Sequence, residues 1–160
     1  MPSSDDEGSA TSTETVRPST IDMALEVVQL PVSDIDRAKR FYQSLGWRFD
    51  IDLVVSDDFR TVQFTPLHSQ CSIQFGRGRT TAEPGSAQGL FLVVSDIEAA
   101  REDLISRGVD VSEVAVQRPP GLDAPEGRSY FAQAAFSDPD GNSWVLQEVT
   151  TRLPGREWED

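Results

Sequence analysis

The sequence predicts an α+β fold built from two tandem βαβββ modules. One observation is an internal repeat, in which Asp34 and Asp96 each follow an apolar segment and precede a helical pattern, at an offset of 62 residues. A second is that each helical pattern ends at a glycine, Gly46 in the first copy and Gly108 in the second. A third is that strand-like segments follow each helix. Two copies of one unit in 160 residues fit one domain made of two similar halves.

The first module is expected to span residues 24–78. An apolar segment over 25–32 predicts its first strand. Asp34 or Ser33 then offers a side-chain oxygen that caps a helix, whose apolar residues recur at helical spacing until Gly46. Three more strands are predicted, over residues 47–55, 60–66 and 71–76.

The second module is expected to span residues 88–150, after a linker over 76–88 that is rich in glycine, proline and serine. Its elements repeat those of the first: a strand, a helix capped by Asp96 or Ser95, and three strands. These segments are a first strand over 89–94, a helix ending at Gly108, and strands over 109–114, 128–136 and 143–150, with a loop over 117–127 and a turn over 138–142.

Composition and charge narrow the function classes. Residues 1–20 form an acidic tail that we expect to be disordered, and 151–160 form a C-terminal extension. The net charge of −13 argues against a nucleic-acid partner, which needs clustered lysine and arginine. No apolar segment is long enough for a membrane span, and no secretory signal is visible. With a single cysteine, Cys71, no intramolecular disulfide can form, and a cytoplasmic location is expected.

Two motifs at opposite ends of the repeat carry a family resemblance. The segments LPVSDIDRAKRFYQSLGW and FSDPDGNSWVLQE resemble the vicinal-oxygen-chelate superfamily, which includes glyoxalase I, bleomycin-resistance proteins, fosfomycin-resistance enzymes and extradiol dioxygenases. The resemblance covers about residues 24–150. It implies that the two modules form a curved, cup-shaped mixed sheet with the helices outside and a ligand, often with a divalent metal, inside. It also implies a homodimer.

The resemblance places metal ligands at four positions, which in this chain are Val27, Gly89, Val145 and Gln74. Three of these residues cannot bind a metal, and Gln74 offers only a neutral amide. Iron dioxygenases of this fold use two histidines and a carboxylate, whereas this chain has one histidine, His68, in a predicted loop. We therefore expect neither a metal nor another cofactor, and a dioxygenase is close to excluded. A glyoxalase-like site would need its ligands in shifted positions.

Glutamines share the strand faces on which the implied metal-ligand positions lie. Residues two apart in a strand share a face, so Gln29 shares the face of Val27 and Gln147 shares that of Val145. Amides in an apolar concavity favour a site that orients a neutral polar ligand, although they could instead pair with one another, with the backbone or with solvent. The predicted ligand-binding residues are Gln29, Gln63, Gln74, Gln133, Gln147, Val27 and Val145.

Acids and bases are scarce in the predicted strands. Asp50 and Asp52 share a parity and are interpreted as a solvated strand edge, while Asp138 and Asp140 belong to the predicted turn. His68 is a weak candidate for a general base. Most strand aromatics are expected in the core, and Trp144 is assigned to the helix-packed face by its parity.

Four hypotheses follow. The first is a metal-independent protein that binds a small organic molecule in an apolar, glutamine-lined cup, in the manner of the bleomycin-resistance proteins. The second is an enzyme of this fold, a lyase or isomerase, that needs no metal. The third is a metal-dependent, glyoxalase-like lyase. The fourth is an interaction module that contacts a partner through the acidic tail and the C-terminal segment. The sequence leaves open whether turnover occurs.

Overall fold

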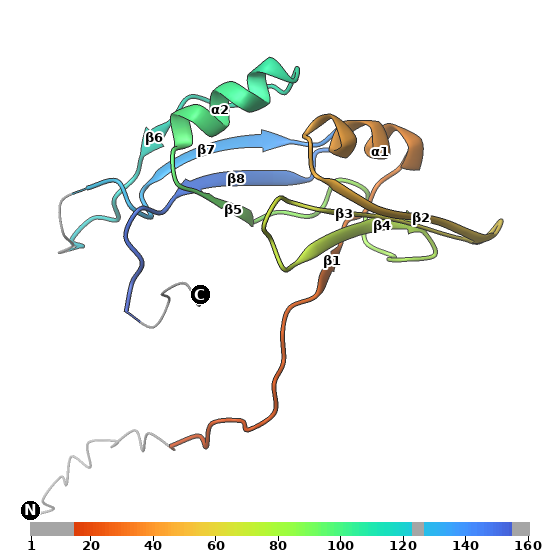
Figure 1. Cartoon of the computed structure of the whole chain (residues 1–160), viewed down its shortest axis with the longest axis horizontal. Helices are drawn as coiled ribbons and strands as arrows, with labels where there is room; N and C mark the ends of the chain where they lie inside the picture. The colour runs from red at the N-terminus through yellow and green to blue at the C-terminus, as the bar shows by residue number, and fades with distance from the viewer. Residues whose placement is uncertain (1–14, 123–126, 155–160) are drawn as a thin grey trace, which may run out of the picture.

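The computed structural model describes residues 15–122 and 127–154 of the chain. Two mixed sheets lie side by side, with one helix over the same face of each sheet (Figure 1). The elements are β1 (Val27–Gln29), α1 (Ile35–Ser44), β2 (Arg48–Ser56), β3 (Phe59–Thr65), β4 (Ser72–Arg77), β5 (Leu90–Val94), α2 (Ile97–Ser106), β6 (Ala115–Val116), β7 (Ala132–Ser137) and β8 (Ser143–Glu148).

The two sheets repeat one topology. The strand orders are β1-β4-β3-β2 and β5-β8-β7-β6. In each sheet the first and last strands of the module pair in parallel, and the remaining neighbours are antiparallel. The predicted α+β fold of two βαβββ modules is confirmed. Among the described residues, no helix is both long enough and apolar enough to cross a membrane.

Both predicted helix caps are present. Asp34 Oδ1 accepts a hydrogen bond from Arg37 N at 3.0 Å, and Asp96 Oδ1 accepts one from Ala99 N at 3.1 Å. Each side chain satisfies an N–H group that has no partner within its helix. Gly46 has a φ of +79°, in the left-handed region that suits glycine, and directs the chain from α1 towards β2.

Alternation along the strands gives each sheet two different faces. On the helix side, Phe64 and Phe75 pack against Tyr42 of α1, and all three are buried. Trp144 and Leu146 lie in the same core, as their parity predicts. The opposite face of both sheets, here called the open face, is covered by no helix of the described chain (Figure 1).

A buried hydrogen-bond cluster joins the two modules. The Tyr42 hydroxyl of α1 donates to Asp138 Oδ2 at 2.8 Å and accepts from Trp144 Nε1 at 3.1 Å. Asn142 Nδ2 donates to the same Asp138 oxygen and to the Pro31 carbonyl. Burial raises the pKa of Tyr42, and the Asp138 charge raises it further, so the hydroxyl stays protonated. The two sequence motifs therefore meet in space and fix one module against the other.

The interpretation of Asp138 and Asp140 as turn residues is corrected, because both carboxylates also bind residues of module one. Asp138 Oδ1 accepts from Asp140 N and Asn142 N, as a turn residue would, while its other oxygen serves the joint. Asp140 Oδ1 accepts from the Ser33 backbone and hydroxyl and forms an ion pair with Arg37 at 3.2 Å. Asp138 holds the turn between β7 and β8 against Tyr42 near the end of α1, and Asp140 holds it against the start of α1.

Some predicted strands are shorter than expected, and the strand over 109–114 is wrong. In that segment the Ser112 N–H donates to the Ala135 carbonyl of β7, and the Ser112 hydroxyl accepts from the Ala135 N–H. The side chain thus occupies an N–H group that regular strand pairing would use. Regular pairing starts only at β6. The predicted strand over 128–136 starts at Ala132, because Tyr130 has a φ of +70°. Residues 1–14 of the predicted tail, 123–126 of the loop and 155–160 of the extension lie outside the described residues.

Candidate ligand-binding site

Three glutamines lie side by side across the open face of module one. Gln29 of β1 and Gln63 of β3 each stand directly opposite Gln74 of β4 in the strand register. Gln29 Nε2 donates to Gln74 Oε1 at 2.6 Å, and Gln74 Nε2 donates to Gln63 Oε1 at 2.7 Å. The three half-buried amides form one hydrogen-bonded chain, here called the amide row.

The amide row ends at a carboxylate. Gln63 Nε2 donates to Asp50 Oδ2 at 3.0 Å, Thr65 donates to the same oxygen, and Arg48 Nε lies 2.6 Å from the other. A register shift between Phe49 and Ile51 turns the Asp50 side chain onto the open face. Burial opposes ionisation, but the hydrogen bonds from Arg48, Thr65 and Gln63 outweigh it and lower the pKa of Asp50.

Asp52 lies on the other face of β2 from Asp50. The predicted solvated edge is wrong for both aspartates, because each carboxylate is paired with basic side chains. Asp52 pairs with Val62 in the register and forms ion pairs with Lys39 of α1 at 2.8 Å and with Arg60 at 2.9 Å. The hydrogen bonds from Arg60 lower the pKa of Asp52 most, and Lys39 adds to the effect. The bulge changes the parity on which the sequence-based assignment depended.

Arg79 also contacts the amide row, and sequence reasoning missed it. Its Nη2 donates to Gln74 Oε1 at 2.8 Å, and its guanidinium lies 5.2 Å from the ring centre of Phe59. The residue follows β4 in a segment assigned to the linker. The signal for Arg79 in the sequence was its position shortly after the predicted strand that carries Gln74.

The open face of module two carries the apolar side chains Phe91, Val93 and Val145 together with Gln133 and Gln147. Phe91 stands opposite Val145, and Val93 stands opposite Gln147. Phe91 is 51% exposed and Val93 is 41% exposed, and both lie on β5, the edge strand of its sheet. The offset of 62 residues aligns Gln29 with Phe91, so an amide in one module corresponds to an aromatic ring in the other.

The remaining predicted glutamines stand apart from the amide row. Gln147 Nε2 donates to the Tyr130 carbonyl at 3.0 Å, and Gln133 lies opposite Gln147 in the register. Gln29 and Gln147 do not occupy equivalent positions in the two modules. Gln29 stands opposite Gln74 in module one, and the equivalent pair in module two is Phe91 and Val145. Val27 borders the amide row, next to Ser72.

The four positions implied for metal ligands do not fit a divalent ion. Val27 and Val145 are hydrocarbon and Gly89 has no side chain, while the Gln74 carbonyl accepts hydrogen bonds from both Gln29 and Arg79. These residues support no chemistry through a metal at those positions.

A separate acidic cluster, formed by Asp96, Glu98 and Glu148, lies at the start of α2. Arg128 pairs with Glu98 at 2.6 Å and with Glu148 at 3.6 Å, and Glu148 accepts from the Ile97 backbone. These contacts give the cluster a structural role, in which Glu148 caps the helix and Arg128 offsets the charge.

His68 and Cys71 lie at the connection between β3 and β4. His68 is exposed in a turn with a φ of +65°, and its ring has no hydrogen bond to any residue that the structure describes. Burial raises the pKa of the Cys71 thiol, and the Glu26 charge adds to the rise, so the thiolate is disfavoured. Neither side chain is arranged for catalysis.

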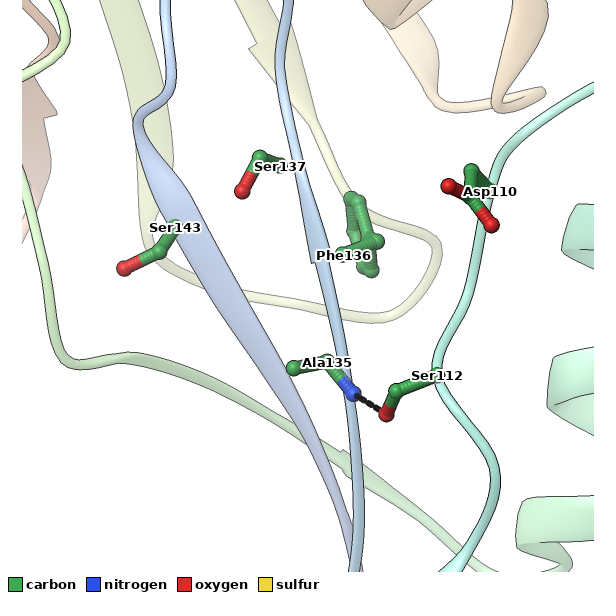
Figure 2. Close-up of a pocket in the computed structure, with 6 residues that line it drawn as sticks. All are labelled: Asp110, Ser112, Ala135, Phe136, Ser137 and Ser143. Atoms are coloured by element: carbon green, nitrogen blue, oxygen red, sulfur yellow. Dashed lines mark hydrogen bonds between the residues drawn. The ribbon is translucent and has the colours of Figure 1, made fainter.

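A depression of about 430 Å³ lies at the edge of module two (Figure 2). Its lining includes Asp110 and Ser112 from the irregular segment, and Ala135, Ser137 and Ser143 from β7 and β8. It does not reach the amide row.

Comparison with known proteins agrees with the resemblance. Residues 24–146 match the model of a family described as Glyoxalase/Bleomycin resistance protein/Dioxygenase superfamily. No match was found among curated proteins. The predicted vicinal-oxygen-chelate resemblance is therefore confirmed over most of the chain.

Several solved structures are similar to this chain. TnmS3, an antibiotic binding protein from Streptomyces sp. CB03234, is 30% identical with a TM-score of 0.65, and the match covers 82% of this chain and 99% of that one. A glyoxalase/bleomycin resistance protein from the same organism is 31% identical with a TM-score of 0.60, covering 78% and 99% of the two chains. A member of the superfamily from Sphaerobacter thermophilus DSM 20745 is 26% identical with a TM-score of 0.62, covering 79% and 98%.

Proposed function

This chain belongs to the Glyoxalase/Bleomycin resistance protein/Dioxygenase superfamily, and we propose that it binds a small, largely apolar organic molecule on its open face without a metal. The observation that carries the proposal is the contrast between the two halves of that face. Module one presents a hydrogen-bonded row of amides, and module two presents Phe91 and Val93, which are both partly exposed to solvent. Sites for small molecules combine an apolar wall with a few placed polar groups.

Binding without turnover is favoured over catalysis. In the described part of the chain, the carboxylate of the amide row is Asp50, and its lowered pKa keeps it charged and paired with Arg48. A general acid or base needs a pKa near the working pH. The solved structure of an antibiotic binding protein with 30% identity is consistent with a binding role.

A second copy of the chain would help to enclose the ligand, and we include a homodimer in the proposal. The partly exposed apolar side chains of the open face are Ile51, Leu53, Phe91 and Val93. Apolar side chains gathered on one uncovered face favour a covering partner or ligand. Sedimentation at micromolar concentration should give the mass of two chains, and a monomer would remove this part of the proposal.

Thermal unfolding with a panel of planar aromatic compounds tests the proposal. A ligand at 100 times its dissociation constant adds about 2.7 kcal/mol, which raises Tm by roughly 5–10 °C for a chain of this size. Gln74→Met and Phe91→Ala should each reduce that shift, whereas Gln43→Met on the exposed side of α1 should not. A ligand whose shift survives both site variants would place binding elsewhere. One divalent ion per chain, lost together with binding on chelation, would contradict the metal-free part.

A further inference from the structure

We infer that the amide row presents hydrogen-bond donors, so that the bound molecule must offer acceptor oxygens to it. This inference rests on the proposed function and names the chemistry of its ligand. An amide can point either its N–H₂ or its carbonyl at a neighbour, so the direction of a glutamine chain needs an anchor. Asp50, as a carboxylate, can only accept.

Asp50 fixes the direction of the whole row. Gln63 must turn its nitrogen towards Asp50, at 3.0 Å, and its carbonyl towards Gln74. Gln74 must then donate to Gln63 and present its own carbonyl to Gln29. Each step follows from the one before, because a donor cannot face a donor.

Arg79 imposes the same direction independently. A guanidinium can only donate, and Arg79 Nη2 lies 2.8 Å from Gln74 Oε1. The Gln74 carbonyl must therefore point towards Arg79, as it also does under the direction set by Asp50. Two anchors at different points of the row agree, which makes the reversed arrangement unfavourable.

The fixed direction consumes acceptors and leaves donors. Both lone pairs of the Gln74 carbonyl are occupied, by Gln29 and Arg79, and the Gln63 carbonyl accepts from Gln74 and keeps one lone pair. Each of the three amide nitrogens has two N–H groups, and the contacts within the described chain use one from each. Gln29 Oε1 and Arg79 Nε have no partner among the described residues, but both atoms are shielded from solvent, so they add neither an acceptor nor a donor to the surface.

Charge and spacing sharpen the chemistry of the ligand. Arg48 and Arg79 outnumber Asp50, so the row has a local excess of positive charge on a chain whose net charge is −13. Neighbouring strands lie about 4.8 Å apart, so the spare N–H groups recur at that interval. A planar molecule that places one or more carbonyl oxygens against the amide row and its hydrocarbon part against Phe91 and Val93 matches this arrangement.

Two probes of the same shape test the inference. 2-Acetylnaphthalene has a carbonyl acceptor, and 2-isopropenylnaphthalene replaces that oxygen with a methylene group while keeping the planar carbon. Titration followed by ¹H–¹⁵N spectra of the side-chain amides should show roughly two- to tenfold tighter binding of the ketone, as expected for one net hydrogen bond. The side-chain N–H₂ signals of the amide row should shift with the ketone alone.

The double variant Asp50→Asn with Arg79→Met should reduce the preference for the ketone, because it removes both anchors that fix the direction of the row. Each single variant keeps one anchor and should retain most of the preference, and Gln43→Met should leave it unchanged. Equal affinity of the two probes for the wild-type protein would overturn the inference and leave the proposed function standing. Binding of neither probe, with no stabilising compound in the aromatic panel, would overturn both.

Discussion

Tyr42→Phe removes one oxygen atom at the joint between the modules and is expected to destabilise the protein. The Tyr42 side chain is fully buried, and its hydroxyl donates to Asp138 and accepts from Trp144. Phenylalanine keeps the ring and its packing against Phe64 and Phe75, so the change isolates the hydrogen bonds.

The magnitude follows from what the substitution leaves behind. A hydrogen bond to a charged group contributes about 1.5–3 kcal/mol, and a buried donor left without a partner costs about 1–3 kcal/mol. Asp138 keeps its bonds from Asp140 and Asn142, so the stranded group is the Trp144 N–H. Because local relaxation recovers part of the loss, we expect the free energy of unfolding to fall by about 2–4 kcal/mol.

Urea denaturation followed by circular dichroism measures this loss as a lower midpoint at an unchanged m-value. Tyr130→Phe is the matched control, because among the described residues the Tyr130 hydroxyl accepts a single 3.3 Å hydrogen bond, from Leu153 N. That variant should change stability by less than about 0.5 kcal/mol. If Tyr42→Phe is equally mild, the Tyr42 hydroxyl does not hold the modules together.

Three further predictions concern the sheet, an ion pair and the cysteine. Gly76→Ala should lower the free energy of unfolding by at least about 3 kcal/mol, because a Cβ there would lie 1.8 Å from the Arg60 carbonyl oxygen. Gly89→Ala adds its Cβ in open space and should cost about 1–2 kcal/mol, because Gly89 has a positive φ. Equal losses for the two variants in urea denaturation would refute this reasoning. Asp52→Asn should cost about 1–3 kcal/mol at pH 7 through the lost ion pairs. Since the folded pKa of Asp52 lies below its ordinary value of 3.8, that difference should shrink as the pH falls below 3.8, and a constant difference down to pH 2 would contradict the pairing. Cys71 should react with iodoacetamide more slowly than a free cysteine, with a rate still rising above pH 9, and a plateau below pH 8 would show that its pKa is not raised.

The repeat made most of the fold predictable. An aspartate before each helix and a glycine after it are local signals, since capping and positive φ depend on a few neighbouring residues. Parity placed Trp144 in the core correctly, because β8 is regular. The joint was not predictable, because Tyr42 and Asp138 lie far apart in the chain and meet only after both modules fold.

Local irregularities limited the prediction of the site. Parity carries through a strand only while its register is unbroken, and the shift before Ile51 separated Asp50 from Asp52. The strand prediction over 109–114 was wrong because the Ser112 side chain accepts a hydrogen bond from Ala135 N, and sequence periodicity does not reveal such a bond. The glutamine positions were predicted by residue type, but the direction of their hydrogen bonds depends on Asp50 and Arg79, which only the structure brings to them.

Intermolecular NOEs from bound 2-acetylnaphthalene test the central claim most directly, because they locate the ligand on the protein. We predict contacts from the ring protons to Phe91 and Val145, and contacts from the acetyl methyl group to the side-chain amide protons of Gln74. Contacts confined to Asp110 and Ser112 beside β7, or to the exposed side of a helix, would show that the open face is not the binding site.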